Sequence, residues 1–147
     1  MAQWANEGMS FDEVLQKAKA AVAETKTVFA LSSFGNLVKN GRVSKLAGML
    51  AQTLNLWGVG IESSGTIAMK TKVKGKMRML KTIVADMEER GFEGLEVAIT
   101  HCQNAEMAEA LRAMIVEKFP NAQVFVGKTR GLDSFYSERG GLIVSYR

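Results

Sequence analysis

The sequence predicts an α/β domain, α+β-like in its order of elements, with two layers: a mixed sheet of about six strands and about four helices on one face. Three observations lead to this fold class. Six short apolar stretches have the character of strands, four longer segments have helical periodicity, and hairpin turns occur among the helices. Because helices and hairpins are interspersed, we expect a mixed sheet with helices packed on it. The 147 residues suit a single domain with a substantial core.

The first elements are a helix, a strand and a short helical fragment. Ser10-Phe11-Asp12-Glu13 is a capping box, so we expect a helix from there to about Glu24. An apolar strand should follow from Thr27 to Leu31. The next fragment, Phe34 to Lys39, is ended by Asn40-Gly41, a dipeptide that suits the left-handed turn after a helix. The first helix is expected to bury Phe11, Val14, Leu15, Ala18, Ala21 and Val22.

The middle of the chain combines a second helix with an unusual strand. Ser44 is placed to cap a helix to Leu54, whose buried stripe would be Leu46, Met49, Leu50, Thr53 and Leu54. The strand Leu56 to Ile61 places Trp57, Val59 and Ile61 on one face. Gly58 and Gly60 share the other face. Two glycines leave the backbone bare there, so either another element or a ligand must approach it closely.

The second half of the chain supplies the remaining elements. They are a hairpin turn at Ser63-Ser64-Gly65, a strand from Thr66 to Lys74, a helix from Gly75 to Arg90, a strand from Leu95 to His101, a helix capped by Asn104 and stopped by Pro120, a strand from Ala122 to Val126, a polar irregular segment from Thr129 to Gly140, and a strand from Leu142 to Tyr146. The two helices should face inward through Met77, Leu80, Ile83, Val84, Met87, Met107, Leu111, Met114, Ile115 and Phe119.

Composition limits the class of protein. Hydrophobic content of 47% and charged content of 23% are ordinary for a globular domain. A single Cys excludes an intramolecular disulfide and fits a reducing compartment. No stretch approaches the roughly 20 apolar residues of a membrane span, and the N-terminus does not have the pattern of a secretion signal, so we expect a cytoplasmic protein.

Charge permits an anionic partner without requiring nucleic acid. The net charge is +4, and basic residues alternate through Lys70, Lys72, Lys74, Lys76 and Arg78. Nucleic-acid sites would interleave aromatic side chains with these charges, and none occur here, so we expect no nucleic-acid partner. The pattern fits docking of an acidic partner, and it fits better a solvated strand face whose lysines discourage edge-to-edge pairing.

Chemistry-bearing residues are few. His101 and Cys102 are the only His and the only Cys, and adjacent strand residues point to opposite faces, so they cannot readily share a proton. One His and one Cys are too few for a metal site. The phosphate-loop, dinucleotide and nucleophile-elbow motifs are absent. We therefore expect no enzymatic activity, no metal and no cofactor.

Two motifs resemble a known family. Leu37-Val38-Lys39-Asn40-Gly41-Arg42-Val43-Ser44, followed by Leu54-Asn55-Leu56, resembles the LxxGGRIS and LNIKPIL signature of the DegV family. The tail Phe135 to Leu142 stands where that family has HTGPGALG. DegV proteins are bacterial two-domain carriers of fatty acids, some of which present the lipid to a fatty acid kinase. The resemblance covers their C-terminal domain. It implies that residues 1–147 form one such domain, with residues 1–8 as the end of an absent N-terminal domain.

The resemblance also implies a ligand site. In the family, the arginine of the first motif and the tail loop lie near the lipid carboxylate, which implies ligand-binding roles for Arg42, for Ser137 in place of Thr, and for Tyr136 in place of His. Glu138 and Arg139 replace Gly and Pro, and Trp57-Gly58-Val59-Gly60 replaces Lys-Pro-Ile-Leu. The bare strand face at Gly58 and Gly60 completes the set of candidate ligand-binding residues.

The favoured function is binding of a fatty acid or related acyl lipid, with a fatty acid kinase as a further partner. Nine methionines suit a deformable apolar tunnel as well as an ordinary core. The alternative is a structural or protein-interaction domain whose apolar face meets a partner or a second copy. Without the first domain, we expect an exposed apolar patch and association into a homodimer or a detergent-sensitive oligomer.

Overall fold

The structure is a computed structural model that describes residues 1–43, 55–63 and 65–147. The helix expected from Ser44 to Leu54, with its stripe of Leu46, Met49 and Leu50, lies outside the described residues, as does Ser64 in the hairpin turn.

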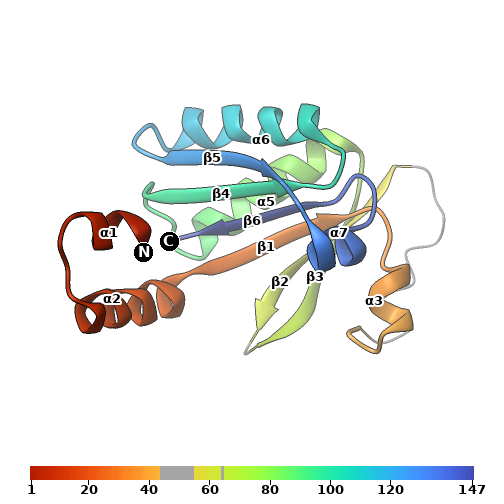
Figure 1. The fold of residues 1–147 in the computed structure, drawn as a ribbon. Coiled ribbons are helices and arrows are strands. Elements are labelled where there is room, and N and C mark those ends of the chain that lie inside the picture. The colour runs from red at the N-terminus through yellow and green to blue at the C-terminus, as the bar shows by residue number, and fades with distance from the viewer. Residues whose placement is uncertain (44–54, 64) are drawn as a thin grey trace.

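The sheet is mixed, as the sequence predicts (Figure 1). Its strands lie in the order β3-β2-β1-β6-β4-β5. Among the described strands, β4 and β5 alone pair in parallel, and every other neighbouring pair is antiparallel. The strands are β1 (Lys26–Leu31), β2 (Leu56–Ser63), β3 (Thr66–Lys74), β4 (Glu96–His101), β5 (Gln123–Lys128) and β6 (Leu142–Tyr146).

Six helices occur in the described part of the chain: α1 (Ala2–Asn6), α2 (Phe11–Glu24), α3 (Gly35–Lys39), α5 (Lys76–Glu89), α6 (Ala105–Lys118) and α7 (Gly131–Ser137). The helices α5 and α6 cover one face of the sheet, where they bury the main core. The short helices α3 and α7 lie together at one end of the molecule (Figure 1). The segment 129–140, expected to be irregular, therefore contains a helix.

Alternation along β1 divides the apolar side chains between two clusters. Val28 and Ala30 point into the main core with α5 and α6. Phe29 and Leu31 point to the opposite face, where they pack with three side chains around α3, namely Phe34, Leu37 and Val43. This second cluster lies beneath the candidate site described below.

The helix α2 corrects one prediction. Its capping box is present, with Ser10 Oγ accepting from the Glu13 N–H and Glu13 Oε2 accepting from the Ser10 N–H. None of its 14 residues is buried, and Phe11 and Val22 are 79% and 75% exposed. The predicted buried face is wrong for this chain because no described element covers it. The apolar periodicity is present, but the helix lies beside the start of β1 rather than on the sheet (Figure 1).

The helix α5 buries nearly the side predicted for it. Leu80, Ile83, Val84 and Met87 are buried as expected, whereas Met77 is exposed and Met79 takes its place in the core. Met77 lies in the first turn of α5 and is 57% exposed. In α6, Met107, Leu111 and Ile115 are buried, and Met114 and Phe119 are packed against the same core.

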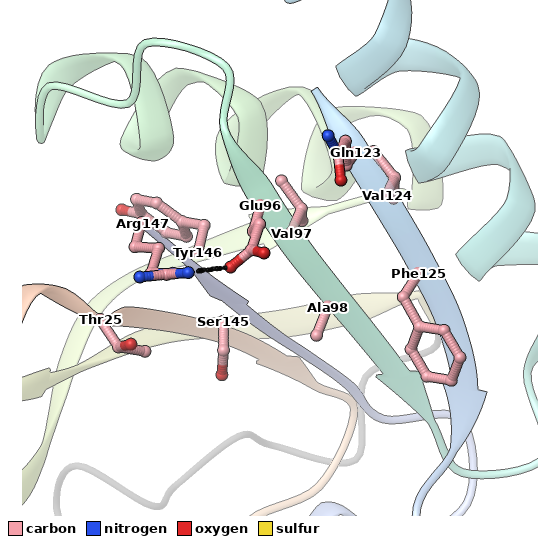
Figure 2. A pocket seen from close by; sticks show the side chains of 10 residues that line it. All are labelled: Thr25, Glu96, Val97, Ala98, Gln123, Val124, Phe125, Ser145, Tyr146 and Arg147. Carbon is pink, nitrogen blue, oxygen red and sulfur yellow. Dashed lines mark hydrogen bonds and ion pairs between the residues drawn. The ribbon is translucent and has the colours of Figure 1, made fainter. Parts of the chain in front are cut away.

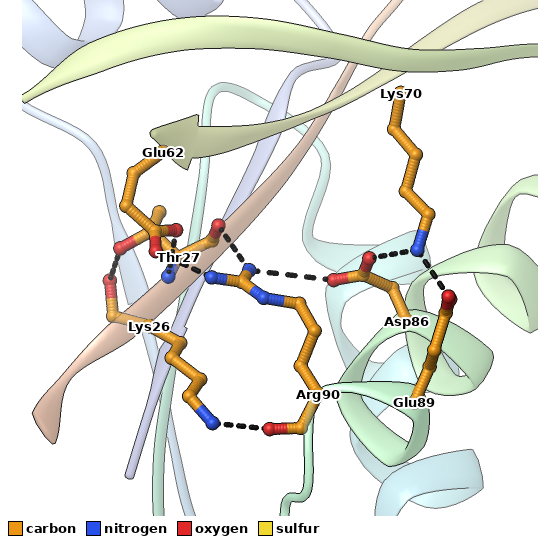
Figure 3. A network of polar contacts seen from close by, with 8 residues as sticks. Lys26, Thr27, Glu62, Lys70, Asp86, Glu89 and Arg90 are labelled. Atoms are coloured by element: carbon orange, nitrogen blue, oxygen red, sulfur yellow. Dashed lines mark hydrogen bonds and ion pairs between the residues drawn. The ribbon is translucent and has the colours of Figure 1, made fainter. Parts of the chain in front are cut away.

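A polar network ties the β2–β3 hairpin to α5 (Figure 3). Arg90 donates hydrogen bonds to Glu62 and to the Thr27 carbonyl, and Lys70 donates to Asp86 at 2.6 Å and to Glu89 at 2.5 Å. The Asp86 carboxylate is buried between Lys70 and Arg90. Lys70 is thus exposed, but its charge is paired with Asp86 and Glu89, so it does not belong to a purely solvated basic face.

This network predicts a loss of stability in acid. Partial burial raises the pKa of the Glu62 carboxyl, but hydrogen bonds from Arg90 and from the Thr27 N–H outweigh it, so the pKa lies below its ordinary value. A lowered pKa stabilises the folded state above the unfolded pKa, and this stability is lost as pH falls through the folded pKa. Denaturant titrations between about pH 6 and pH 3 should therefore show a shallower decline for Glu62→Gln than for wild type. Glu109→Gln, in an exposed pair with Arg112, should keep the wild-type decline. An unchanged decline in Glu62→Gln would contradict the assignment.

Within the described ranges, no helix combines the length and apolar character needed to cross a membrane.

Candidate ligand-binding site

A cavity of about 530 Å³ lies over the second apolar cluster, bounded by α3, α7 and the turn of the β2–β3 hairpin. Its size falls within the range of small-molecule sites. The lining is apolar at the sheet and polar at the rim. The lining residues are Phe29, Leu31, Leu37, Gly41, Arg42, Gly65, Thr66, Ile67, Leu132, Asp133, Tyr136, Ser137 and Ile143. Three of the five predicted site residues, Arg42, Tyr136 and Ser137, are therefore brought together from positions far apart in the sequence.

The glycine face of β2 is covered by aromatic rings of the chain itself. A Cβ at Gly60 would lie 2.3 Å from Phe29 Cζ, and a Cβ at Gly58 would lie 2.5 Å from Phe34 Cε2. The sequence left open whether another element or a ligand packs against this bare strand face. In the structure, the rings of Phe29 and Phe34 pack against it. Neither glycine lines the cavity, but Gly60 makes room for the Phe29 ring, which does. A role of these glycines in ligand binding would thus be indirect.

Arg42 is held at its place by backbone hydrogen bonds. Gly41 has φ of +66°, and the N–H groups of Gly41 and Arg42 donate to the carbonyls of Val38 and Leu37. These two bonds form a Schellman motif that ends α3. The Arg42 side chain is exposed at the rim of the cavity, and across the described residues 1–43, 55–63 and 65–147 it makes no hydrogen bond or ion pair. The guanidinium is thus available to an anionic group at the rim.

Ser137 presents a buried hydroxyl. It is the last residue of α7 and is 2% exposed, and its Oγ has no hydrogen-bond partner among the described residues. An unsatisfied buried hydroxyl costs about 1–3 kcal/mol, so a hydrogen-bonding ligand atom in the cavity would be favoured. Gly141 packs against this turn, because a Cβ there would lie 2.3 Å from the Ser137 carbonyl oxygen.

Tyr136 contributes its ring to the cavity wall. The side chain is half-buried, packs against the second apolar cluster and meets Phe135 edge to face with ring centroids 5.1 Å apart. The sequence did not indicate the other lining residues of this wall, Leu132 and Asp133, because they belong to α7, a helix that the pattern left as irregular chain. Asp133 is exposed at the rim, so an anionic head group is favoured nearer Arg42 and Ser137 than nearer Asp133.

His101 and Cys102 are structural. His101 is buried, and its Nδ1 accepts a hydrogen bond from the Asn104 N–H at 3.1 Å. Asn104 Nδ2 in turn donates to the Gly140 carbonyl at 2.6 Å, which fixes the loop after α7. Cys102 Sγ lies 3.9 Å from the Ser134 carbonyl oxygen. In the part of the chain that the structure describes, no group of three or more His, Cys, Asp or Glu side chains is placed to hold a metal ion.

A second hollow of about 680 Å³ lies over β4, β5 and β6 (Figure 2). An Arg147–Glu96 ion pair at 2.5 Å lies at one side of this hollow, and the Phe125 ring, 66% exposed, lies at the other. It contains none of the predicted site residues. The sequence did not indicate it, because its lining comes from three strands that are far apart in the sequence.

Family comparison agrees with the motifs. The family model described as "Uncharacterised protein, DegV family" matches residues 1–145. The chain belongs to the DegV family. A DegV domain-containing protein of Streptococcus pyogenes serotype M3 is 37% identical over 142 residues, which are 96% of this chain and 51% of the relative. One from Streptococcus gordonii is 37% identical over 145 residues, 98% of this chain and 52% of the relative. The chain thus spans about half the length of the curated DegV relatives it matches.

Solved DegV structures share the fold. A DegV family protein from Eubacterium eligens loaded with heptadecanoic acid gives a TM-score of 0.93 at 34% identity, covering 99% of this chain and 53% of that chain. The fatty acid kinase (Fak) B3 protein of Streptococcus pneumoniae, loaded with linoleic acid, gives a TM-score of 0.92 at 34% identity, covering 99% of this chain and 52% of that chain. Both of these relatives are described by the fatty acid with which they are loaded.

Proposed function

We propose that this chain binds a fatty acid in the cavity between α3 and α7, with the carboxylate at Arg42 and Ser137 and the acyl tail over Phe29, Leu31 and Ile143. One observation carries the proposal: a single cavity joins an available guanidinium, a buried hydroxyl without a partner and an apolar floor. Two DegV relatives at 34% identity that hold fatty acids support the ligand class.

Tail and head group contribute differently. A 16-carbon tail gains on the order of 12 kcal/mol gross, at ~0.8 kcal/mol per buried methylene. A charge-assisted hydrogen bond to the carboxylate contributes about 1.5–3 kcal/mol. The tail therefore supplies most of the affinity, and Arg42 and Ser137 decide which end of the lipid lies at the rim.

The proposal includes partners beyond the lipid. Because the chain spans half the length of its relatives, we propose that a second, N-terminal DegV domain completes the binding site. A fatty acid kinase is the proposed recipient, which the description of the Streptococcus pneumoniae relative supports. The cytoplasmic location expected from the sequence stays a prediction.

Lipid extraction and mass spectrometry test the function directly. The purified chain, alone and joined to the first half of the Streptococcus pyogenes relative, should release fatty acid in amounts approaching one per protein. Ile143→Glu, which places a carboxylate in the apolar floor, should release little, while Gln123→Glu in the second hollow should release as much as wild type. Circular dichroism checks that both variants fold. Absence of lipid from the joined protein, together with no binding of added palmitate, would refute the proposal.

The alternative function, a protein-interaction domain, is favoured by one specific surface. Phe11, Leu15 and Val22 of α2 are exposed along a single helix face. Such faces promote association, so we expect light scattering to show a dimer or a detergent-sensitive oligomer. Phe11→Ser/Val22→Ser should shift the chain toward monomer, and Ala20→Ser on the same helix should not. A clean monomer over a wide concentration range, unaffected by fatty acid, would count against this surface.

A further inference from the structure

Glu138 adopts a backbone conformation that glycine favours. Its φ is +53° and its ψ is 178°, directly after the last residue of α7. L side chains rarely occupy this region, which is sterically costly for any residue with a Cβ. In the HTGPGALG motif that the tail resembles, the equivalent residue is glycine. The turn alone therefore does not account for a glutamate at position 138.

The explanation lies in what the carboxylate contacts. Glu138 Oε1 accepts a hydrogen bond from the Asn36 N–H at 3.0 Å, in the first turn of α3. Asn36 Nδ2 donates to the Phe135 carbonyl at 2.8 Å, so Asn36 donates two hydrogen bonds from α3 to the C-terminal end of α7. The residue at the N-cap of α3, Phe34, has no side chain that could cap it. A glutamate 102 residues away in sequence therefore takes that role.

These two bonds connect the two polar parts of the ligand cavity. The helix α3 has five residues and ends at the turn that places Arg42. The helix α7 ends at Ser137, the neighbour of Glu138. Short helices have few packing contacts of their own. The two Asn36 hydrogen bonds, here called the tie, join the start of α3 to the end of α7 and so limit the movement of Arg42 relative to the Ser137 hydroxyl.

We propose that Glu138 is a positioning residue for the ligand site: through Asn36 it restrains Arg42 relative to Ser137, and both residues line the same cavity. This inference rests on the proposed fatty-acid function. It predicts that loss of the tie weakens recognition of the head group while leaving recognition of the tail intact, because the apolar floor lies on β1 and β6 and does not depend on the tie.

The test compares Glu138→Gly with Glu138→Gln and with Arg139→Ala, an exposed neighbour in the same loop. All three variants are measured in the full chain and in the joined two-domain protein. Dissociation constants are taken for palmitate and for its methyl ester, which has the same tail without the charge, and melting temperatures are recorded alongside. Hydrogen exchange of the Asn36 amide reports on the tie itself.

Glu138→Gly should weaken palmitate binding by roughly tenfold, leave methyl ester binding unchanged and speed exchange of the Asn36 amide. Its melting temperature should stay level or rise, since glycine relieves the positive φ. Glu138→Gln keeps the acceptor oxygen and should restore most of the palmitate affinity, and Arg139→Ala should behave as wild type.

If Glu138→Gly loses affinity equally for palmitate and for the methyl ester and has a lower melting temperature, Glu138 is a purely structural cap and the inference is overturned. Unchanged palmitate binding in Glu138→Gly would also overturn it while leaving the proposed function intact. If the wild-type protein binds neither ligand, the proposed function fails and this role for Glu138 fails with it.

Discussion

Gly60→Ala is expected to lower the free energy of unfolding by about 1–3 kcal/mol, the range for forcing extra volume into a packed interior. The added Cβ would lie 2.3 Å from Phe29 Cζ and 2.7 Å from the Ala68 carbonyl oxygen. The second contact is with backbone of the paired strand, which cannot move without breaking the β2–β3 ladder, where a bulge already occurs between Val59 and Gly60. Displacing the Phe29 ring should also narrow the cavity.

Gly127→Ala is the matched control for this prediction. It is also a strand glycine, and its Cβ would lie 2.8 Å from Phe125 Cε1. The Phe125 ring is largely exposed and can rotate away, so Gly127→Ala should lower the free energy of unfolding by less than about 1 kcal/mol. Urea titrations of both variants measure the difference. If both variants lose the same free energy of unfolding, or if Gly60→Ala loses none, the Phe29 ring does not lie over Gly60 as the structure places it.

Arg42→Ala carries the largest expected effect on recognition of the head group. In the two-domain protein it should weaken fatty-acid binding by roughly 1–3 kcal/mol, because it removes a charge-assisted hydrogen bond to the carboxylate. Alanine keeps the backbone N–H that donates to Leu37 and ends α3, so the melting temperature without ligand should hardly move. Isothermal titration calorimetry with palmitate gives the affinity.

Lys39→Ala is the control for the charge alone. Lys39→Ala removes one positive charge, as Arg42→Ala does. Because Lys39 is in the last turn of α3 but does not line the cavity, its loss should change the affinity for palmitate little. If Arg42→Ala instead lowers the melting temperature sharply and leaves affinity unchanged, the arginine serves only to end the helix.

The mixed sheet and the core helices were predictable because their signals are local. Periods of two and of about 3.6 residues locate strands and helices, and the capping box at Ser10 and the glycine stop at Gly41 mark their ends. Arg42, Tyr136 and Ser137 were found through motifs of the DegV family. Their convergence on one cavity follows from the sheet order, which places the ends of β1 and β6 side by side.

Other features depend on contacts that no local pattern encodes. Periodicity shows that α2 has an apolar face, but whether that face is buried depends on what packs against it. The helix α7 has only seven residues, so its Leu132, Phe135 and Tyr136 are too few to form a repeating apolar stripe. Hydrogen bonds of Thr129, Ser134 and Glu138 also hold it in place. Likewise, two glycines on a strand indicate a close approach, but their spacing does not distinguish the rings of Phe29 and Phe34 from a ligand.

The position of the bound lipid tests the central claim most directly. Stearic acid with a paramagnetic doxyl group on its tail broadens NMR signals of nearby side chains, so methyl signals of Leu31, Ile67 and Ile143 should broaden on titration, and those of Val97 and Val124 beside the second hollow should not. Broadening centred on Val97 and Val124, with Leu31 and Ile143 unaffected, would contradict the account and place the lipid on the β4-β5-β6 face.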